Sequence, residues 1–178
     1  ENWTSTAPGI LRFTDLVSGT NYTVEKVITN NTGVPWNRFA NELLDPAGQA
    51  NDNDDVLPYP AFVPAGFTTS NDNDGLSFAQ GSGLPRTSSV FGSVLADELS
   101  DSRDFLDFFN GNLAVGATDD ATTFGLRDSD PANNQPFLLV QRPNESSRQV
   151  PDSGTTVTLL GIGLLGMARL RRLLGRKS

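Results

Sequence analysis

Two runs of aspartate and asparagine are the side chains in this sequence best suited to hold a ligand. They read Asn51-Asp52-Asn53-Asp54-Asp55 and Asn71-Asp72-Asn73-Asp74-Gly75. Calcium takes several hard oxygen ligands on a flexible loop. A calcium site is therefore one interpretation, with Asp52, Asp54, Asp55, Asp72 and Asp74 as ligands. A solvated acidic loop or an Asx-turn is the favoured interpretation, because no glutamate closes an EF-hand pattern after Gly75.

Catalytic side chains are scarce. The chain has no histidine and no cysteine, which removes the commonest general base, thiolate metal ligands and disulfides. A glycosidase uses a pair of carboxylates. Carboxylates that lie close in sequence could supply such a pair (Asp101, Asp104 and Asp107; Asp119 and Asp120). Any acidic loop of this composition offers such pairs, and no phosphate-binding glycine motif or Ser-x-x-Lys pattern is present. We therefore expect a protein that is not an enzyme.

Aromatic side chains raise a second binding hypothesis, because Trp36, Phe39, Tyr59, Phe62 and Phe67 could stack on sugars. Core packing is the favoured interpretation for Trp36 and Phe39. The prolines at 58, 60 and 64 disfavour a central strand, so Tyr59 and Phe62 are expected at an edge or in a loop. A calcium- or carbohydrate-binding module therefore stays open as an alternative function.

The C-terminal end of the sequence differs in character from the rest. Val150, Pro151, Asp152, Ser153 and Gly154 precede an uncharged stretch from Thr155 to Ala168, followed by Arg169, Arg171, Arg172, Arg176 and Lys177. As a helix, the uncharged stretch measures ~21 Å and reaches ~30 Å only if it continues to Leu174. The pattern predicts a marginal membrane helix with a cytoplasmic C-terminus. A buried or amphipathic helix of the preceding domain is the alternative.

The charge distribution favours the membrane interpretation. All 21 acidic residues precede residue 155, together with eight of the 13 basic ones, so the body carries −13 and the tail +5. Such asymmetry indicates a tail with a separate role. Because phosphate groups repel the acidic body, we expect no nucleic-acid partner.

The order of short motif, apolar helix and basic end resembles the C-terminal sorting signal of PEP-CTERM proteins, in the variant that reads VPDSG. The resemblance implies that an exosortase, a membrane-embedded cysteine protease, recognises Val150 to Gly154 and cuts nearby. It further implies an exported chain at the cell surface or in the extracellular matrix of a Gram-negative bacterium. We accordingly expect Glu1 to lie near a processed N-terminus.

Strand patterns separated by Gly, Pro, Asn and Asp clusters predict an all-β domain over residues 1–145. The predicted strands are 10–17, 22–29, 36–44, 76–79, 105–109, 122–127 and 137–142, with 88–99 left undecided between helix and strand. Residues 30–33 predict a turn, and the apolar run 137–140 predicts a central strand. We expect a β-sandwich (immunoglobulin-like or jelly-roll-like), a polar linker and sorting motif over 146–154, and a hydrophobic helix with a basic end over 155–178.

The body is also similar to PEP-CTERM passenger domains. The similarity lies in the strand end and turn at 28–33, followed by Trp36 and Glu42-Leu43. It also includes short sequence motifs at 75–78, 107–117 and 137–141. It implies a β-sandwich passenger with no defined activity. We expect a structural or adhesive protein without a cofactor. The rival hypothesis is a filament subunit that keeps its tail and forms homo-oligomers through its apolar C-terminal helices.

Overall fold

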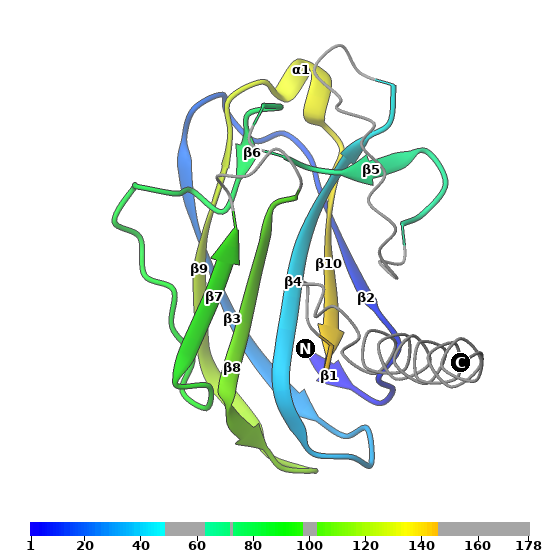
Figure 1. Cartoon of the computed structure of the whole chain (residues 1–178), viewed down its shortest axis with the longest axis vertical. Coiled ribbons are helices and arrows are strands. Elements are labelled where there is room, and N and C mark those ends of the chain that lie inside the picture. Colours follow the sequence, from blue (N-terminus) through cyan, green and yellow to red (C-terminus); the bar gives the residue numbers. More distant parts are fainter. Residues whose placement is uncertain (49–62, 72, 98–102, 146–178) are drawn as a thin grey trace, which may run out of the picture. The chain divides into compact units, whose positions relative to one another are not determined.

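The computed structural model describes residues 1–48, 63–71, 73–97 and 103–145, which form two β-sheets and one short helix (Figure 1). Sheet A contains, in spatial order, β1 (Asn2–Trp3), β3 (Asn21–Asn30), β9 (Thr118–Asp128) and β6 (Leu76–Ser77). Sheet B contains β2 (Gly9–Phe13), β10 (Phe137–Pro143), β4 (Trp36–Pro46), β8 (Phe105–Leu113) and β7 (Ser93–Asp97), and β5 (Phe67–Thr69) pairs with β4. The helix α1 (Pro131–Asn134) joins β9 to β10.

The two sheets confirm the prediction of an all-β domain built as a sandwich, and each of the seven predicted strands is present. Several predicted ends are wrong: β8 (Phe105–Leu113) ends four residues later than predicted, and β9 (Thr118–Asp128) begins four residues earlier. Strand β2 stops at Phe13, because Asp15 adopts a left-handed backbone (φ 61°), and β6 stops at Ser77, because Ala79 does the same (φ 55°). The undecided region contains the strand β7. The predicted linker and C-terminal helix (146–178) lie outside the described residues.

Strand β10 is central in sheet B, as its apolar sequence predicts. It pairs antiparallel with β2 on one side and with β4 on the other, and each of its seven residues is buried. A strand covered on both faces needs no polar alternation, which explains the continuous run Phe137-Leu138-Leu139-Val140.

The main core lies between the sheets and is rich in aromatic rings. Trp36 and Phe39 stack with ring centroids 5.7 Å apart, and both are almost fully buried, which confirms their predicted place in the core. Sheet A contributes Ile28, Phe124 and Leu126 to the same cluster. Burial of each such side chain stabilises the fold by ~1.5–3 kcal/mol.

The predicted turn after β3 is confirmed, and its geometry depends on Asn30. The Asn30 amide donates to the carbonyl oxygens of Val34 (2.8 Å) and Leu113 (2.9 Å), while its oxygen accepts from the Thr32 backbone and hydroxyl. The Thr32 hydroxyl accepts in turn from the Trp36 indole (3.0 Å). One buried amide therefore ties this turn to both the core and the end of β8.

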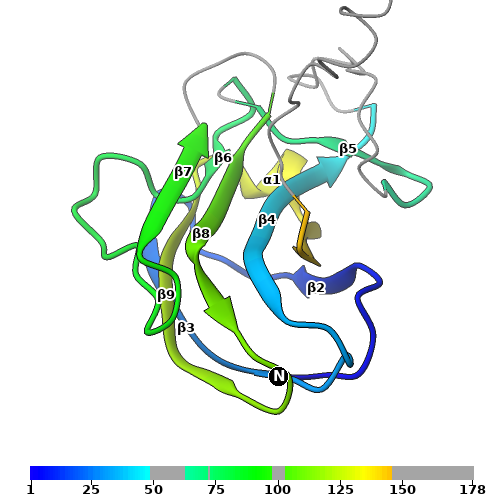
Figure 2. The ribbon, with the colours of Figure 1, turned by 60° about the horizontal axis from the view of Figure 1, so that its bottom comes forward.

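Strands β1 and β2 lie at the edges of different sheets, and residues 4–8 connect them. Figure 2 shows the N-terminus close to this connection, with β3 and β9 in one layer and β4 and β8 in the other. Because β1 belongs to sheet A and β2 to sheet B, the chain crosses from one sheet to the other at this side of the sandwich.

The face of sheet B directed away from the core carries a buried ionic cluster. Glu42 alternates with the core residue Leu43 along β4 and therefore points to the opposite face. Its carboxylate binds the guanidinium groups of Arg103 and Arg142, and all three side chains are almost fully buried. Arg142 also lies 3.4 Å from the Glu145 carboxylate.

The substitution Glu42→Gln tests how much this ionic cluster contributes to the free energy of unfolding. The neutral amide would leave Arg103 and Arg142 charged and buried without their shared counter-ion, and breaking a buried pair costs ~3–5 kcal/mol. We expect the urea midpoint of unfolding to fall accordingly. Glu25, an exposed residue of β3, provides the matched control Glu25→Gln, which should unfold like the unaltered chain. Equal midpoints for all three proteins would show that the cluster does not stabilise the fold.

Candidate functional site

Asp74 is the only residue of the predicted calcium set that lies within the described ranges, and its carboxylate serves the local backbone. One oxygen accepts the Asn71 N–H (3.0 Å) and the other accepts the Leu76 N–H (2.8 Å). The Asn71 side chain accepts the Asn73 N–H (2.9 Å), which is the Asx-turn considered from the sequence. Within the ranges that the structure describes, no three acidic side chains form a group suited to a metal ion.

The surroundings of Asp74 change its acidity. Only 2% of the residue is exposed, and this burial raises the pKa of Asp74 to about 6, although the hydrogen bonds from Asn71 and Leu76 oppose the rise. The charge of Asp128 contributes a smaller part of this rise in the pKa. Asn134 links the two residues, since its amide donates to the Asp74 carbonyl (2.9 Å) and to the Asp128 carboxylate (3.1 Å). The group is thus a buried, pH-sensitive part of the scaffold.

The carboxylates considered for glycosidase chemistry hold loops in place. The Asp119 carboxylate accepts hydrogen bonds from the hydroxyls of Ser88, Ser89 (2.8 Å) and Thr122 (2.8 Å). Burial alone would raise the pKa of Asp119, but these hydrogen bonds hold it below its usual value. Asp119 therefore stays ionised at neutral pH and is a poor general acid. Its sequence neighbour Asp120 is exposed.

Asp104 and Asp107 also belong to the carboxylates considered for glycosidase chemistry, and both are fully buried. Asp107 lies in β8, and Asp104 directly precedes that strand. Asp104 accepts the Ser70 hydroxyl (2.6 Å), and the two residues also share a backbone hydrogen bond. Asp107 faces Arg38 at 3.8 Å. These contacts place both carboxylates among structural partners, away from an open surface.

The aromatic candidates separate into two groups. Trp36 and Phe39 lie in the core, and Phe67 packs half-buried against a small cluster of Leu44, Leu138 and Val140 on the opposite face of sheet B. Tyr59 and Phe62 lie outside the described residues. Trp36 and Phe39, which are almost fully buried, therefore present no ring face to solvent.

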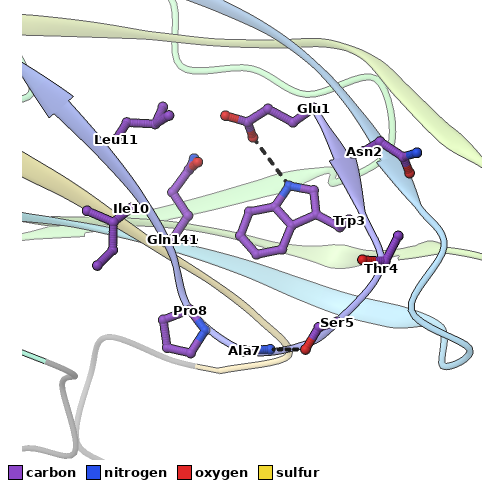
Figure 3. Close-up of a pocket in the computed structure, with 11 residues that line it drawn as sticks. Glu1, Asn2, Trp3, Thr4, Ser5, Ala7, Pro8, Ile10, Leu11 and Gln141 are labelled. Atoms are coloured by element: carbon purple, nitrogen blue, oxygen red, sulfur yellow. Dashed lines mark hydrogen bonds between the residues drawn. The ribbon is translucent and has the colours of Figure 1, made fainter.

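A pocket that the sequence did not predict lies between β1 and β2, with a volume of about 440 Å³ (Figure 3). We call it the N-terminal pocket; its lining comes from residues 1–5, 7–11 and 141. Trp3 stands within it, and its indole donates to the Glu1 carboxylate (3.3 Å). The Trp3 ring meets Trp36 and Phe39 at nearly right angles, each at 5.7 Å, which anchors it to the core.

A buried lysine lies behind this pocket. The Lys26 ammonium contacts the Glu1 carboxylate (2.7 Å) and the Gln141 side-chain oxygen, and Gln141 donates to Asn41 (2.6 Å). Burial lowers the pKa of Lys26 to about 8, although the charge of Glu1 opposes that shift. Around neutral pH the pair is therefore ionic, and its two charges compensate each other.

Sequence patterns gave little signal for this pocket. Strand β1 has two residues, too few for a period of two to be visible. Gly9 is the residue whose type is connected with the pocket. A Cβ at this position would lie 2.3 Å from a carbon of the Trp3 ring, so a larger residue would collide with the indole. A glycine at that position permits the close approach of the indole.

Comparison with known proteins identifies the other functional feature of the chain. Residues 149–174 match the family model described as VPDSG-CTERM motif. The chain carries an exosortase sorting signal of the PEP-CTERM type. No curated protein and no solved structure matched the chain. The match confirms the resemblance inferred from the sequence and covers the tail alone.

The sorting signal itself has no described geometry. Its motif (Val150, Pro151, Asp152, Ser153 and Gly154), its basic end (Arg169, Arg171, Arg172, Arg176 and Lys177) and the remaining calcium candidates (Asp52, Asp54, Asp55 and Asp72) lie outside the described residues. Among the residues that are described, no helix is long and apolar enough to cross a membrane. The membrane helix therefore stays a prediction from the sequence.

The raised pKa of Asp74 predicts how stability depends on pH. The folded chain keeps this proton up to about pH 6, whereas an aspartate in the unfolded chain loses it near its ordinary pKa of 3.8. Between these values the folded state binds more protons, so the Asp74 contribution falls as pH rises, by up to ~3 kcal/mol. Urea unfolding from pH 4 to pH 7 should show the advantage of the unaltered chain over Asp74→Asn shrinking. Asp120→Asn is the exposed control; a constant difference for Asp74→Asn would contradict the assignment.

Proposed function

We propose that this protein is a structural or adhesive component of the cell surface or extracellular matrix of a Gram-negative bacterium. The supporting observation is the match of residues 149–174 to the VPDSG-CTERM motif. Such a signal indicates an exported, surface-associated protein that an exosortase-like enzyme processes. The β-sandwich of residues 1–145 is the passenger that this signal delivers. The choice between an immunoglobulin-like and a jelly-roll-like sandwich stays a prediction.

A delivery role for the tail fits the division of charge along the chain. The body carries −13 and the tail +5, and the basic end suits the cytoplasmic side of a membrane. Pro151 biases Val150 toward an extended backbone, and Gly154 frees the junction with the apolar stretch. An extended, accessible segment beside the membrane is what a protease requires.

The carboxylates in the described part of the chain take part in structural contacts, which supports a structural or adhesive role without catalysis. Asp74 and Asp119 accept hydrogen bonds that shape loops, and Glu42 is held between two arginines. A catalytic acid or base needs an open position next to a substrate, which these contacts do not leave. We propose that this function needs no cofactor. A calcium-binding module is the alternative.

The experiment replaces Pro151 and Asp152 by alanine in the producing cell. The double variant Pro151→Ala/Asp152→Ala should fold but stay unprocessed, because the protease would no longer recognise the motif. We expect it in the membrane fraction at full length, while the unaltered chain is released or surface-attached in a shorter form. Fractionation followed by immunoblotting gives the readout.

A matched control changes the same residue types within the folded domain. Pro85 and Asp120 are both exposed, and Pro85→Ala/Asp120→Ala should be processed normally. Normal processing of the motif variant would show that Val150–Gly154 is not read as a signal. Release of full-length chain from both motif variant and unaltered protein would favour the filament hypothesis, in which the tail is kept.

A further inference from the structure

The N-terminal pocket combines a fixed indole, polar groups at its rim and a volume suited to a small ligand. Small-molecule sites occupy ~300–1,000 Å³ and unite apolar walls with a few directed polar groups, and this pocket measures about 440 Å³. We propose that it binds a neutral saccharide, with Trp3 as the stacking surface and Glu1 as the main polar contact. The inference rests on the proposed adhesive function and names the chemical class of its partner.

Trp3 is held rigidly enough to serve as a stacking surface. Its ring lies at 88° to Trp36 and at 89° to Phe39, and Gly9 leaves room for its far edge. Figure 3 shows the ring surrounded by the side chains of the pocket, with Gln141 beside it. The C–H faces of a pyranose pack well on a flat aromatic ring. A ring that is already immobilised loses little entropy when a ligand binds.

The polar groups at the rim suit a ligand rich in hydroxyls. One Glu1 oxygen accepts from Lys26 and from the Trp3 indole, and the other accepts no hydrogen bond from the described residues. Thr4 and Ser5 offer hydroxyl groups on the connection between β1 and β2. Each sugar hydroxyl both donates and accepts, so a fixed carboxylate beside hydroxyl groups can meet two neighbouring positions on one ring.

The charges of the pocket favour a neutral ligand over an anionic one. Lys26 lies behind Glu1 and compensates its charge, with 5% of the lysine side chain exposed. The ammonium is therefore not available to a phosphate or sulfate group. The chain as a whole carries −8, which further disfavours polyanions. Pro8, Ile10 and Leu11 supply apolar walls that suit the carbon faces of a sugar.

Binding would be measured by titration calorimetry on the purified full chain, kept in a detergent without a sugar headgroup. The probes are cellohexaose, xylohexaose, mannohexaose and maltohexaose, with inorganic phosphate and a hyaluronan hexasaccharide as charged comparisons. We expect at least one neutral hexasaccharide to bind with a Kd below ~1 mM, a modest affinity of about −4 kcal/mol. The charged probes should bind at least tenfold more weakly.

Three substitutions locate the site. Trp3→Ala and Glu1→Gln should each weaken binding tenfold or more, and Glu25→Gln, an exposed control on β3, should leave it unchanged. Thr4→Val removes one rim hydroxyl from an exposed residue and keeps its shape, so it tests the pocket even if Trp3→Ala does not fold. We expect a several-fold loss for Thr4→Val.

The proposal is overturned if no neutral hexasaccharide binds the folded chain. It is also overturned if Thr4→Val and Glu1→Gln bind as tightly as the unaltered chain, or if only the charged probes bind. These outcomes leave the sorting function untouched, because processing is measured in cells on the motif variant. Failure of that cell experiment with intact sugar binding would in turn overturn delivery by the tail and keep the pocket.

Discussion

Strand β4 pairs with β10 on one side and with β8 on the other, and both of its faces are covered. Phe39 and Leu43 enter the core between the sheets, while Glu42 and Leu44 occupy the opposite face. A shift of one residue in the pairing would place the Glu42 carboxylate in the apolar core and Leu43 among the arginines. The ionic cluster and the core therefore fix the same register from opposite faces of sheet B.

The side of the sandwich where β1 and β2 lie has a different constraint, which is the burial of Lys26. A buried ammonium destabilises the fold unless a partner compensates it, and Glu1 and Gln141 provide that compensation. Glu1 reaches the lysine because β1 pairs in parallel with the end of β3. The same arrangement places Trp3 against Trp36 and creates the N-terminal pocket. Stability and the proposed binding site therefore depend on one set of contacts.

The sequence predicted the strands well where local pattern decides structure. The apolar run of β10 identified a central strand without knowledge of its pairing partners. The predicted ends of β2 and β6 were wrong because Asp15 and Ala79 adopt a left-handed backbone that stops the strands. The sequence around these two residues did not predict that conformation. Strands β1 and β5 were missed because each has three residues or fewer.

The candidate site was harder to predict, since its parts meet only through the fold. Asp119 and Asp74 look like free carboxylates in the sequence, yet distant serines and backbone N–H groups use them. Trp3 looks like an ordinary residue of an N-terminal segment, and its role follows from contacts with Trp36 and Gly9. The sorting signal is the opposite case: a linear motif is read by its order alone, so the sequence was sufficient.

We propose that the folded β-sandwich is exported and that its tail is a delivery signal, removed after use. The most direct test is the intact mass of the native protein isolated from the surface of its own cell. A mass that corresponds to a new C-terminus near Val150–Gly154, with residues 155–178 absent and any anchor added, is the predicted result. A mass that includes every residue through Ser178 would contradict the account.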